Sequence, residues 1–158
     1  MMAPEKAFDH LGEAYRPGRT RRDVSAPILV VDDDRAGEST TIAWLAQAGY
    51  AAAAEADGDA VLRVVRAQMT RVVITELHIP CAEGPCVIAA LKQERLRLPR
   101  LCVLAYTRFT SPADDAWALA AGADAVLHKP GTTEALLREV RRLDGGDDIE
   151  PAFPGAPR

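Results

Sequence analysis

The chain has 158 residues, of which 48% are hydrophobic and 27% are charged, and its formal net charge is −4 at pH 7. This length suits one compact domain with short extensions, and the composition excludes a fibrous or wholly disordered chain. No apolar stretch approaches membrane-spanning length, and the acidic N-terminus lacks the basic and apolar regions of a signal peptide. We therefore expect a cytoplasmic protein without a membrane segment.

Charge is distributed unevenly along the chain. Residues 1–26 form a basic arm with four arginines, residues 27–143 have the pattern of a globular domain, and residues 144–158 form an acidic tail rich in glycine and proline. We expect the arm to be a flexible leader rather than a DNA-binding element, because no recognition helix or interleaved aromatic residues accompany the arginines. The sequence thus predicts no nucleic-acid partner.

The first half of the domain alternates short apolar runs with helical patterns. A strand is expected at 28–31, followed by a helix over about 37–48 that ends at Gly49. A weaker strand is expected at 50–54, where alanines have poor β propensity and the flanking turn residues carry the prediction. A helix over 59–68 follows, with valines and a leucine on its apolar face.

The second half continues this alternation. The strand at 72–75 is apolar on both faces, which is typical of a central parallel strand covered by helices. The helix over 85–95 begins with a proline in its first turn, and the helix that ends at Gly122 begins at the Ser111-Pro112 step. The remaining elements are strands at 101–106 and 125–128 and a last helix over about 132–143.

Five strands that alternate with five helices predict an α/β fold. The expected architecture is a single domain with a flavodoxin-like, doubly wound parallel sheet in the strand order 2-1-3-4-5. Ligands bind such sheets at the carboxyl ends of the strands. We therefore expect the polar residues that stand at strand ends to gather at one edge of the sheet: Asp32, Asp33, Glu76, Thr107 and Lys129.

The order and spacing of these residues resemble a known family. Strand three is followed by the motif Glu76-x-x-Ile79-Pro80-x-x-Glu83-Gly84, and a Lys129-Pro130 step ends strand five. Residues 27–143 are similar to the receiver domain of bacterial response regulators, which has Asp-x-x-Met-Pro-x-x-Asp-Gly after strand three. The resemblance implies signal transduction in a two-component phosphorelay, in which the aspartate of this motif accepts a phosphoryl group.

The resemblance also implies a magnesium site. Asp32, Asp33 and Glu76, together with the backbone carbonyl of His78, would supply the oxygen ligands that this ion prefers. The alternative is that the acidic run from Asp32 to Asp34 only caps the following helix. A weak magnesium site and no site at all are both open.

Glu76 stands where the family has its phosphoacceptor aspartate. Its extra methylene displaces the carboxylate, and a misplacement of about 1 Å can slow an in-line transfer by on the order of a hundredfold. The longer side chain could also reach Lys129 or Thr107 and partly imitate the phosphorylated state, although a phosphate has more charge and one more oxygen. The plainer alternative is that Glu76 only pairs with Lys129.

The residues that would report the state of the site are altered as well. Thr107 fits the Ser or Thr position at the end of strand four by its spacing, although Ala105 takes this place if the alignment shifts. Val126 stands where the resemblance implies an aromatic side chain, and it cannot swing a polar tip between buried and exposed positions. Tyr106 could substitute for that aromatic residue, or could simply pack in the core.

These features favour a degenerate receiver, or pseudo-receiver, that acts as a protein-interaction module and not as an enzyme. We expect it to contact a histidine kinase, a downstream regulator or a second copy of itself, through the face formed by strand four to helix five. One alternative is a conventional, phosphorylated single-domain response regulator. Another is a haloacid-dehalogenase-like phosphatase with Asp32-Asp33-Asp34 as its nucleophile loop. That family also needs an acidic pair at the end of a later strand, whereas Asp147-Asp148 follow a helix and two glycines in the tail.

Overall fold

The structure is a computed structural model that describes residues 28–145. The arm predicted at 1–26 and most of the tail predicted at 144–158 lie outside the described residues. The elements, in chain order, are β1 (Ile28–Val31), α1 (Arg35–Gln47), β2 (Ala52–Glu55), α2 (Gly58–Gln68), β3 (Val72–Thr75), α3 (Val87–Glu94), β4 (Cys102–Thr107), α4 (Pro112–Ala121), β5 (Ala125–His128) and α5 (Thr133–Leu143). No helix within the range 28–145 has the length and apolar character needed to cross a membrane.

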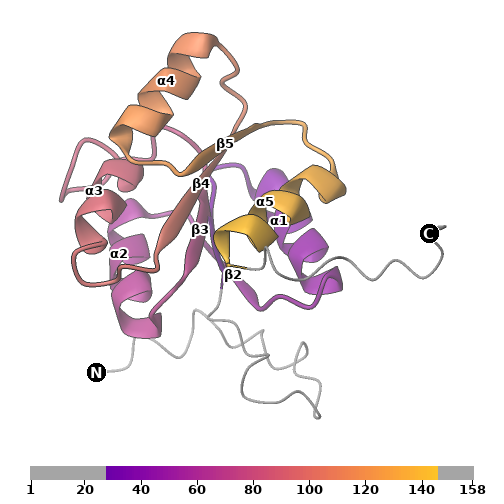
Figure 1. Ribbon diagram of the computed structural model, residues 1–158, viewed down its shortest axis with the longest axis horizontal. Coiled ribbons are helices and arrows are strands. Elements are labelled where there is room, and N and C mark those ends of the chain that lie inside the picture. Colours follow the sequence, from indigo (N-terminus) through magenta and orange to yellow (C-terminus); the bar gives the residue numbers. More distant parts are fainter. Residues whose placement is uncertain (1–27, 146–158) are drawn as a thin grey trace, which may run out of the picture.

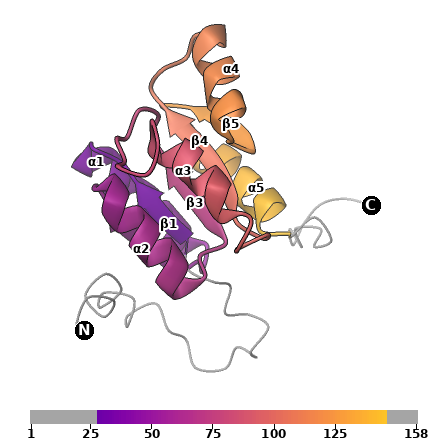
Figure 2. The same ribbon diagram turned by 90° about the vertical axis from the view of Figure 1, so that its left-hand side faces the viewer.

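The strands form one parallel sheet in the order β2-β1-β3-β4-β5, which confirms the predicted fold. Helices lie on both faces of the sheet (Figure 1). α1 and α5 pack on one face through Leu45, Leu136 and Val140. On the other face, which Figure 2 shows with α2 and α3 in front, α2, α3 and α4 form a second apolar cluster.

The central strands are buried on both faces, as their sequences predict. In β1, Leu29 packs on the side of α2 and α3, whereas Ile28 packs on the side of α1 and α5. β3 is buried along its whole length. The alanine-rich strand predicted at 50–54 is also present as β2, shifted to Ala52–Glu55 and paired with β1. Small side chains fit there because Ala52 and Ala53 are buried beneath the flanking helices.

Two helices begin two residues away from their predicted starts. α1 starts two residues earlier, because the carboxylate of Asp34 accepts a hydrogen bond from the amide of Ala36 at 3.2 Å and caps the helix. α3 starts later than 85, because Cys86 is its N-cap residue and Pro85 lies outside the helix. The start of α4 is as predicted, with a reciprocal capping box between Ser111 and Asp114.

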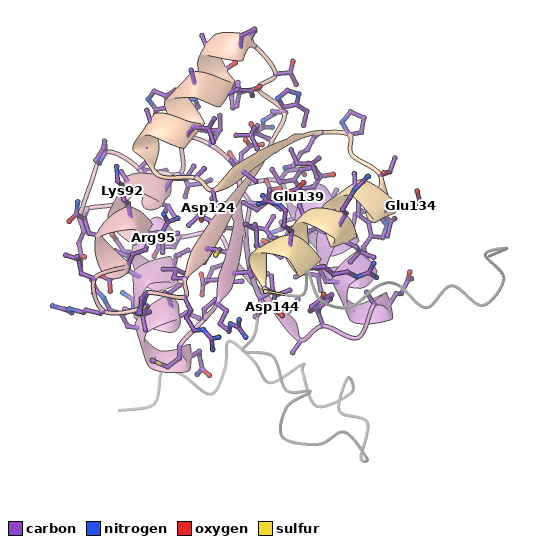
Figure 3. All side chains as sticks on the ribbon, viewed as in Figure 1. Lys92, Arg95, Asp124, Glu134, Glu139 and Asp144 are labelled. Atoms are coloured by element: carbon purple, nitrogen blue, oxygen red, sulfur yellow. The ribbon has the colours of Figure 1, made fainter. Side chains whose placement is uncertain are left out.

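The edge formed by α4 and β5 is the least covered part of the domain. Ala118 is the one buried residue within α4, and every residue of β5 is at least partly exposed. Arg95 at the end of α3 ties this edge to the body, because its guanidinium contacts the carboxylate of Asp124 at 2.5 Å, just before β5 (Figure 3). The exposed surface of α4 and β5 is therefore available for contacts with another molecule.

Candidate functional site

The carboxyl ends of β1, β3 and β5 bring three predicted residues together. The ammonium Nζ of Lys129 lies 2.5 Å from Oδ2 of Asp32 and 3.4 Å from Oε2 of Glu76. The side chains of Asp32 and Glu76 are 5% and 1% exposed, so both carboxylates are removed from water. Two buried carboxylates share one cation, which is the arrangement that the strand-end pattern predicts.

The carboxylate of Glu76 is held by several donors. Its Oε1 accepts a hydrogen bond from the amide of Leu77 at 2.7 Å. Its Oε2 accepts one from the amide of Arg108 at 3.2 Å, in addition to the contact with Lys129. Glu76 therefore points into the edge of the sheet and is fixed there, rather than pointing out into solvent.

Arg108 is a second cation at this edge, and the sequence interpretation missed it. It follows directly after β4, and its guanidinium lies 3.0 Å from Oδ1 of Asp33 and 3.9 Å from Oε2 of Glu76. Its side chain is 54% exposed, so it covers the site from the solvent side. The signal for it was present: a basic residue that immediately follows a strand must lie at the same edge as the acidic residues.

Burial and charge act in opposite directions on Lys129. Burial alone lowers the pKa of its ammonium, but the hydrogen bond to Asp32 and the charges of Asp32 and Glu76 outweigh burial, so the pKa lies above its ordinary value. Lys129 is therefore a cation throughout the physiological pH range. Its ammonium contacts both strand-end acids.

Thr107 lies at the level of this site, and Ala105 does not. Ala105 pairs with Thr75, one residue before Glu76, whereas Thr107 is the last residue of β4. The Thr107 side chain is fully buried, and its hydroxyl accepts a hydrogen bond from the amide of Phe109 at 2.9 Å. The backbone register thus favours Thr107 over Ala105 as the switch position, with its hydroxyl engaged in the following loop.

With this geometry established, comparison with known proteins identifies the family. The response regulator receiver domain family matches residues 28–141 of the chain. The chain belongs to this family. Receiver domains are signalling modules of two-component systems, which agrees with the strand order and with the acids and lysine at the strand ends.

Individual relatives support the same assignment. The response regulator MprA of Mycolicibacterium vanbaalenii is 33% identical over 116 residues, which is 73% of this chain and 49% of that protein. MprA of Mycobacterium tuberculosis strain H37Ra is 32% identical over 120 residues, or 76% of this chain and 51% of that protein. The chain therefore spans about half the length of the curated relatives it matches.

Solved structures of receivers have the same fold. The chemotaxis protein CheY4 of Vibrio cholerae is 27% identical with a TM-score of 0.64, and the match covers 75% of this chain and 98% of that one. A response regulator from Desulfuromonas acetoxidans has a TM-score of 0.66 at 20% identity, over 74% of this chain and 94% of that one. The second match supports the fold alone.

Val126 and Tyr106, the two residues considered for the aromatic readout position, lie on different faces of the sheet. Val126 packs with the cluster on the side of α2, α3 and α4. Tyr106 packs on the opposite side, where its hydroxyl accepts a hydrogen bond from the amide of Gly131 at 3.1 Å. The ring of Tyr106 is therefore packed in the core on the opposite face of the sheet from Val126.

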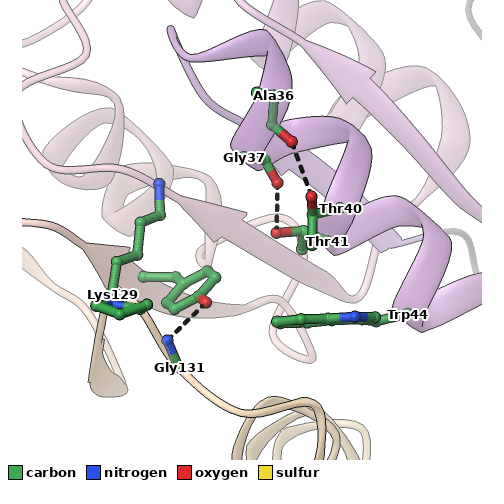
Figure 4. Close-up of a pocket in the computed structure, with 9 residues that line it drawn as sticks. Ala36, Gly37, Thr40, Thr41, Trp44, Lys129 and Gly131 are labelled. Carbon is green, nitrogen blue, oxygen red and sulfur yellow. Dashed lines mark hydrogen bonds between the residues drawn. The ribbon is translucent and has the colours of Figure 1, made fainter.

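A shallow pocket lies on the Tyr106 side of Lys129 (Figure 4). Its volume is about 280 Å³, and it is lined by Ala36, Gly37, Thr40, Thr41, Trp44, Tyr106, Lys129, Pro130 and Gly131. The hydroxyls of Thr40 and Thr41 donate back to carbonyls of α1, each at 3.0 Å. Because the ammonium of Lys129 is directed to the acids, the pocket offers mainly the apolar parts of these side chains.

The predicted magnesium ligands have few oxygens to spare in this arrangement. Asp32 accepts hydrogen bonds from Lys129 and from the amide of Asp34 at 2.9 Å, and both oxygens of Glu76 are engaged. His78 is exposed and has a left-handed backbone with φ of 55°, and its ring packs against Phe109. Within residues 28–145, no group of three or more His, Cys, Asp or Glu side chains is placed to hold a metal. Binding of Mg²⁺ by this set stays a prediction.

Proposed function

We propose that this receiver domain is a cytoplasmic protein-interaction module that is not phosphorylated at Glu76 and has no enzymatic activity. It is a pseudo-receiver in this reading, because it keeps the fold of the family while the residue at the acceptor position, Glu76, pairs with Lys129 instead of accepting a phosphoryl group. The proposal concerns the domain described by residues 28–145. The haloacid-dehalogenase-like alternative is not favoured, because the receiver family match covers residues 28–141 and includes the acidic run. Asp147 and Asp148 lie outside the described residues and carry no argument on this point.

The observation that carries the proposal is the position of the Glu76 carboxylate. It is 1% exposed, and it already accepts the donors that an incoming phosphoryl group would require: the amide of Arg108 and the ammonium of Lys129. An in-line attack needs an exposed oxygen aligned with the donor to within about 1 Å. A carboxylate that fills the phosphate position itself does not meet this requirement.

The same contacts support a domain that stays in one signalling state. Glu76 places negative charge against Lys129 without any transfer reaction, so it imitates part of what a phosphoryl group would do. The imitation is incomplete, because a phosphate brings about two charges and three acceptor oxygens, and Glu76 brings one charge and two oxygens. Val126, which has no polar tip to exchange between positions, fits a module without a phosphorylation-dependent readout.

The proposed partner is a protein, either a histidine kinase or downstream regulator, or a second copy of the chain. The surface from β4 to α5 supports this choice, because α4 buries only Ala118 among its residues and exposes Trp117 and Leu119 by 37% and 51%. Exposed apolar side chains of this size are typical of contact surfaces. The partner would therefore be recognised by shape and apolar contact at α4.

A conventional phosphorylated receiver is the second candidate. Lys129 and Thr107 both lie at the strand ends where the family uses them, and this favours a site that still takes a phosphoryl group. In that case Glu76, or a neighbouring acid, would accept the group slowly. The two candidates differ in one measurable product, which is an acyl phosphate on the protein.

Incubation of the full chain with acetyl phosphate and Mg²⁺, followed by intact mass spectrometry and fragment mapping, tests the proposal. We expect no gain of a phosphoryl group in the wild type. The Glu76→Gln variant is the matched control, since it removes the acid and keeps the shape of the side chain. A phosphoryl group gained by the wild type, either at Glu76 and absent from Glu76→Gln or at a neighbouring acid, would replace the proposal with the second candidate.

A further inference from the structure

The acidic edge contains an unusual number of basic side chains for a site that is expected to hold a metal. Lys129 contacts Asp32 and Glu76, and Arg108 contacts Asp33 and approaches Glu76, so two cations are paired with three carboxylates. The cluster therefore has one residual negative charge from within the protein alone. A divalent ion added to it would have to displace a contact rather than fill a gap.

The hydrogen bonds of the individual carboxylate oxygens lead to the same conclusion. Asp32 is engaged through both oxygens, and so is Glu76. Asp33 uses Oδ1 for Arg108, which leaves its Oδ2 as the one carboxylate oxygen of the three acids with no hydrogen bond among the described residues. Magnesium takes several oxygen ligands in octahedral geometry, and one free oxygen does not provide them.

We propose that Arg108, together with Lys129, takes the place of a divalent cation at this edge, and that Arg108 is the part of the pair that can be removed to open a metal site. The inference goes beyond the proposed function and does not depend on it, because it concerns metal binding in the absence of any phosphoryl donor.

Exposure distinguishes the two cations. The side chain of Lys129 is 19% exposed, and it contacts the two acids that are themselves buried, Asp32 and Glu76. The side chain of Arg108 is 54% exposed and reaches the acids from the solvent side, where an entering ion would also arrive. Loss of Arg108 would free both oxygens of Asp33 and leave three acids with Lys129 alone. The residual charge of the cluster would then be −2, which matches the charge of a divalent cation.

Arginine is well suited to this role. Its guanidinium stays charged at all relevant pH values and presents several N–H donors in one plane, so one side chain contacts Asp33 and approaches Glu76 simultaneously. The backbone amide of the same residue also donates to Glu76. Arg108 thus holds the loop after β4 against the loop after β1, as a bridging metal ion would.

Titration of the full chain with Mn²⁺, measured by loss of the free-ion electron paramagnetic resonance signal, tests this inference with a direct count of bound ion. We expect Arg108→Ala to bind Mn²⁺ at least tenfold more tightly than the wild type, roughly the effect of one unit charge a few ångströms away in a partly screened site. Arg108→Lys retains the charge and should bind like the wild type. Arg63→Ala is the matched control, because it removes the same charge from an exposed position on α2.

The double variant Asp33→Asn with Arg108→Ala locates the bound ion, and it should lose the gained affinity. Circular dichroism of each variant checks that the fold is intact, and Arg108→Gln provides a second neutral side chain should Arg108→Ala fail to fold. The inference is overturned if the wild type binds Mn²⁺ as tightly as Arg108→Ala, or if both neutral variants bind no better than the wild type. It is also overturned if the ion stays bound without Asp33. Competition with Mg²⁺ in the same titration extends the result to that ion.

Discussion

Replacement of Lys129 by methionine tests the electrostatic core of the site. The change keeps an unbranched side chain that is one atom shorter, and it removes the charge that contacts Asp32 at 2.5 Å and Glu76 at 3.4 Å. Breaking a buried ion pair by removal of one partner costs about 3–5 kcal/mol, because a desolvated charge is left without compensation. In Lys129→Met, Glu76 keeps its two backbone donors and Asp32 keeps the amide of Asp34. We therefore expect the free energy of unfolding to fall by about 3 kcal/mol, the lower end of that range.

Urea unfolding of the full chain, followed by circular dichroism, measures this loss as a shift in the midpoint at constant slope. Lys92→Met is the matched control, since Lys92 is exposed on α3, and its free energy of unfolding should change by less than about 0.5 kcal/mol. Addition of Glu76→Gln to Lys129→Met should recover at least about 1 kcal/mol, because one of the two unpaired charges is then gone. A loss below about 1 kcal/mol for Lys129→Met, or no recovery in the double variant, would show that the three side chains are not coupled as described.

Two further predictions concern Lys129 and Gly58. The pKa of Lys129 is raised in the folded state, so its contribution to stability is fully present below the ordinary pKa of 10.5. This contribution is lost as the pH rises through the higher pKa of the folded state. The difference in stability between wild type and Lys129→Met should therefore shrink only above pH 10.5. Urea midpoints of both proteins across pH 7 to about 11.5 check the sign, and a difference that already vanishes near pH 8 would contradict it. Gly58→Ala should cost about 1–3 kcal/mol, because the added Cβ would lie 2.1 Å from the carbonyl oxygen of Pro80 and force the loop after Glu76 to move. Gly84→Ala, whose Cβ would meet Ala90 at an ordinary 3.5 Å, should be much milder, and equal costs would argue against the close approach.

The sheet could be predicted because its central strands are encoded locally. The runs Ile28–Val31 and Val72–Thr75 consist almost entirely of β-branched residues and leucine, and the structure places both strands within those bounds. β2 was harder, because its alanines carry no β preference of their own and its place depends on pairing with β1. The first residue of α1 was predicted two residues too late, and Asp34 caps the helix, as the capping alternative for the acidic run proposes.

The positions of the acids and the lysine of the site can also be predicted from the sequence, whereas their individual hydrogen bonds cannot. The ends of parallel strands must share an edge, so the meeting of Asp32, Glu76 and Lys129 is predictable from topology. The direction of Arg108 is not, because it depends on how the loop after β4 leaves the sheet. The hydroxyl of Thr107 likewise finds a partner in the amide of Phe109, within its own loop, and local hydrogen bonds of this kind are decided by backbone conformation.

The loop after β4 connects the acidic edge to the exposed helix. Arg108 contacts Asp33 and Glu76, and the next residue, Phe109, packs against the ring of His78 at a centroid distance of 5.1 Å. His78 in turn contacts Trp117 of α4 at 4.7 Å. These three rings therefore form a continuous line of packing contacts from the loop after β4 to α4. Val126 offers no comparable route, because it packs among apolar neighbours on the sheet and contacts none of the charged groups through a hydrogen bond or ion pair within the described residues.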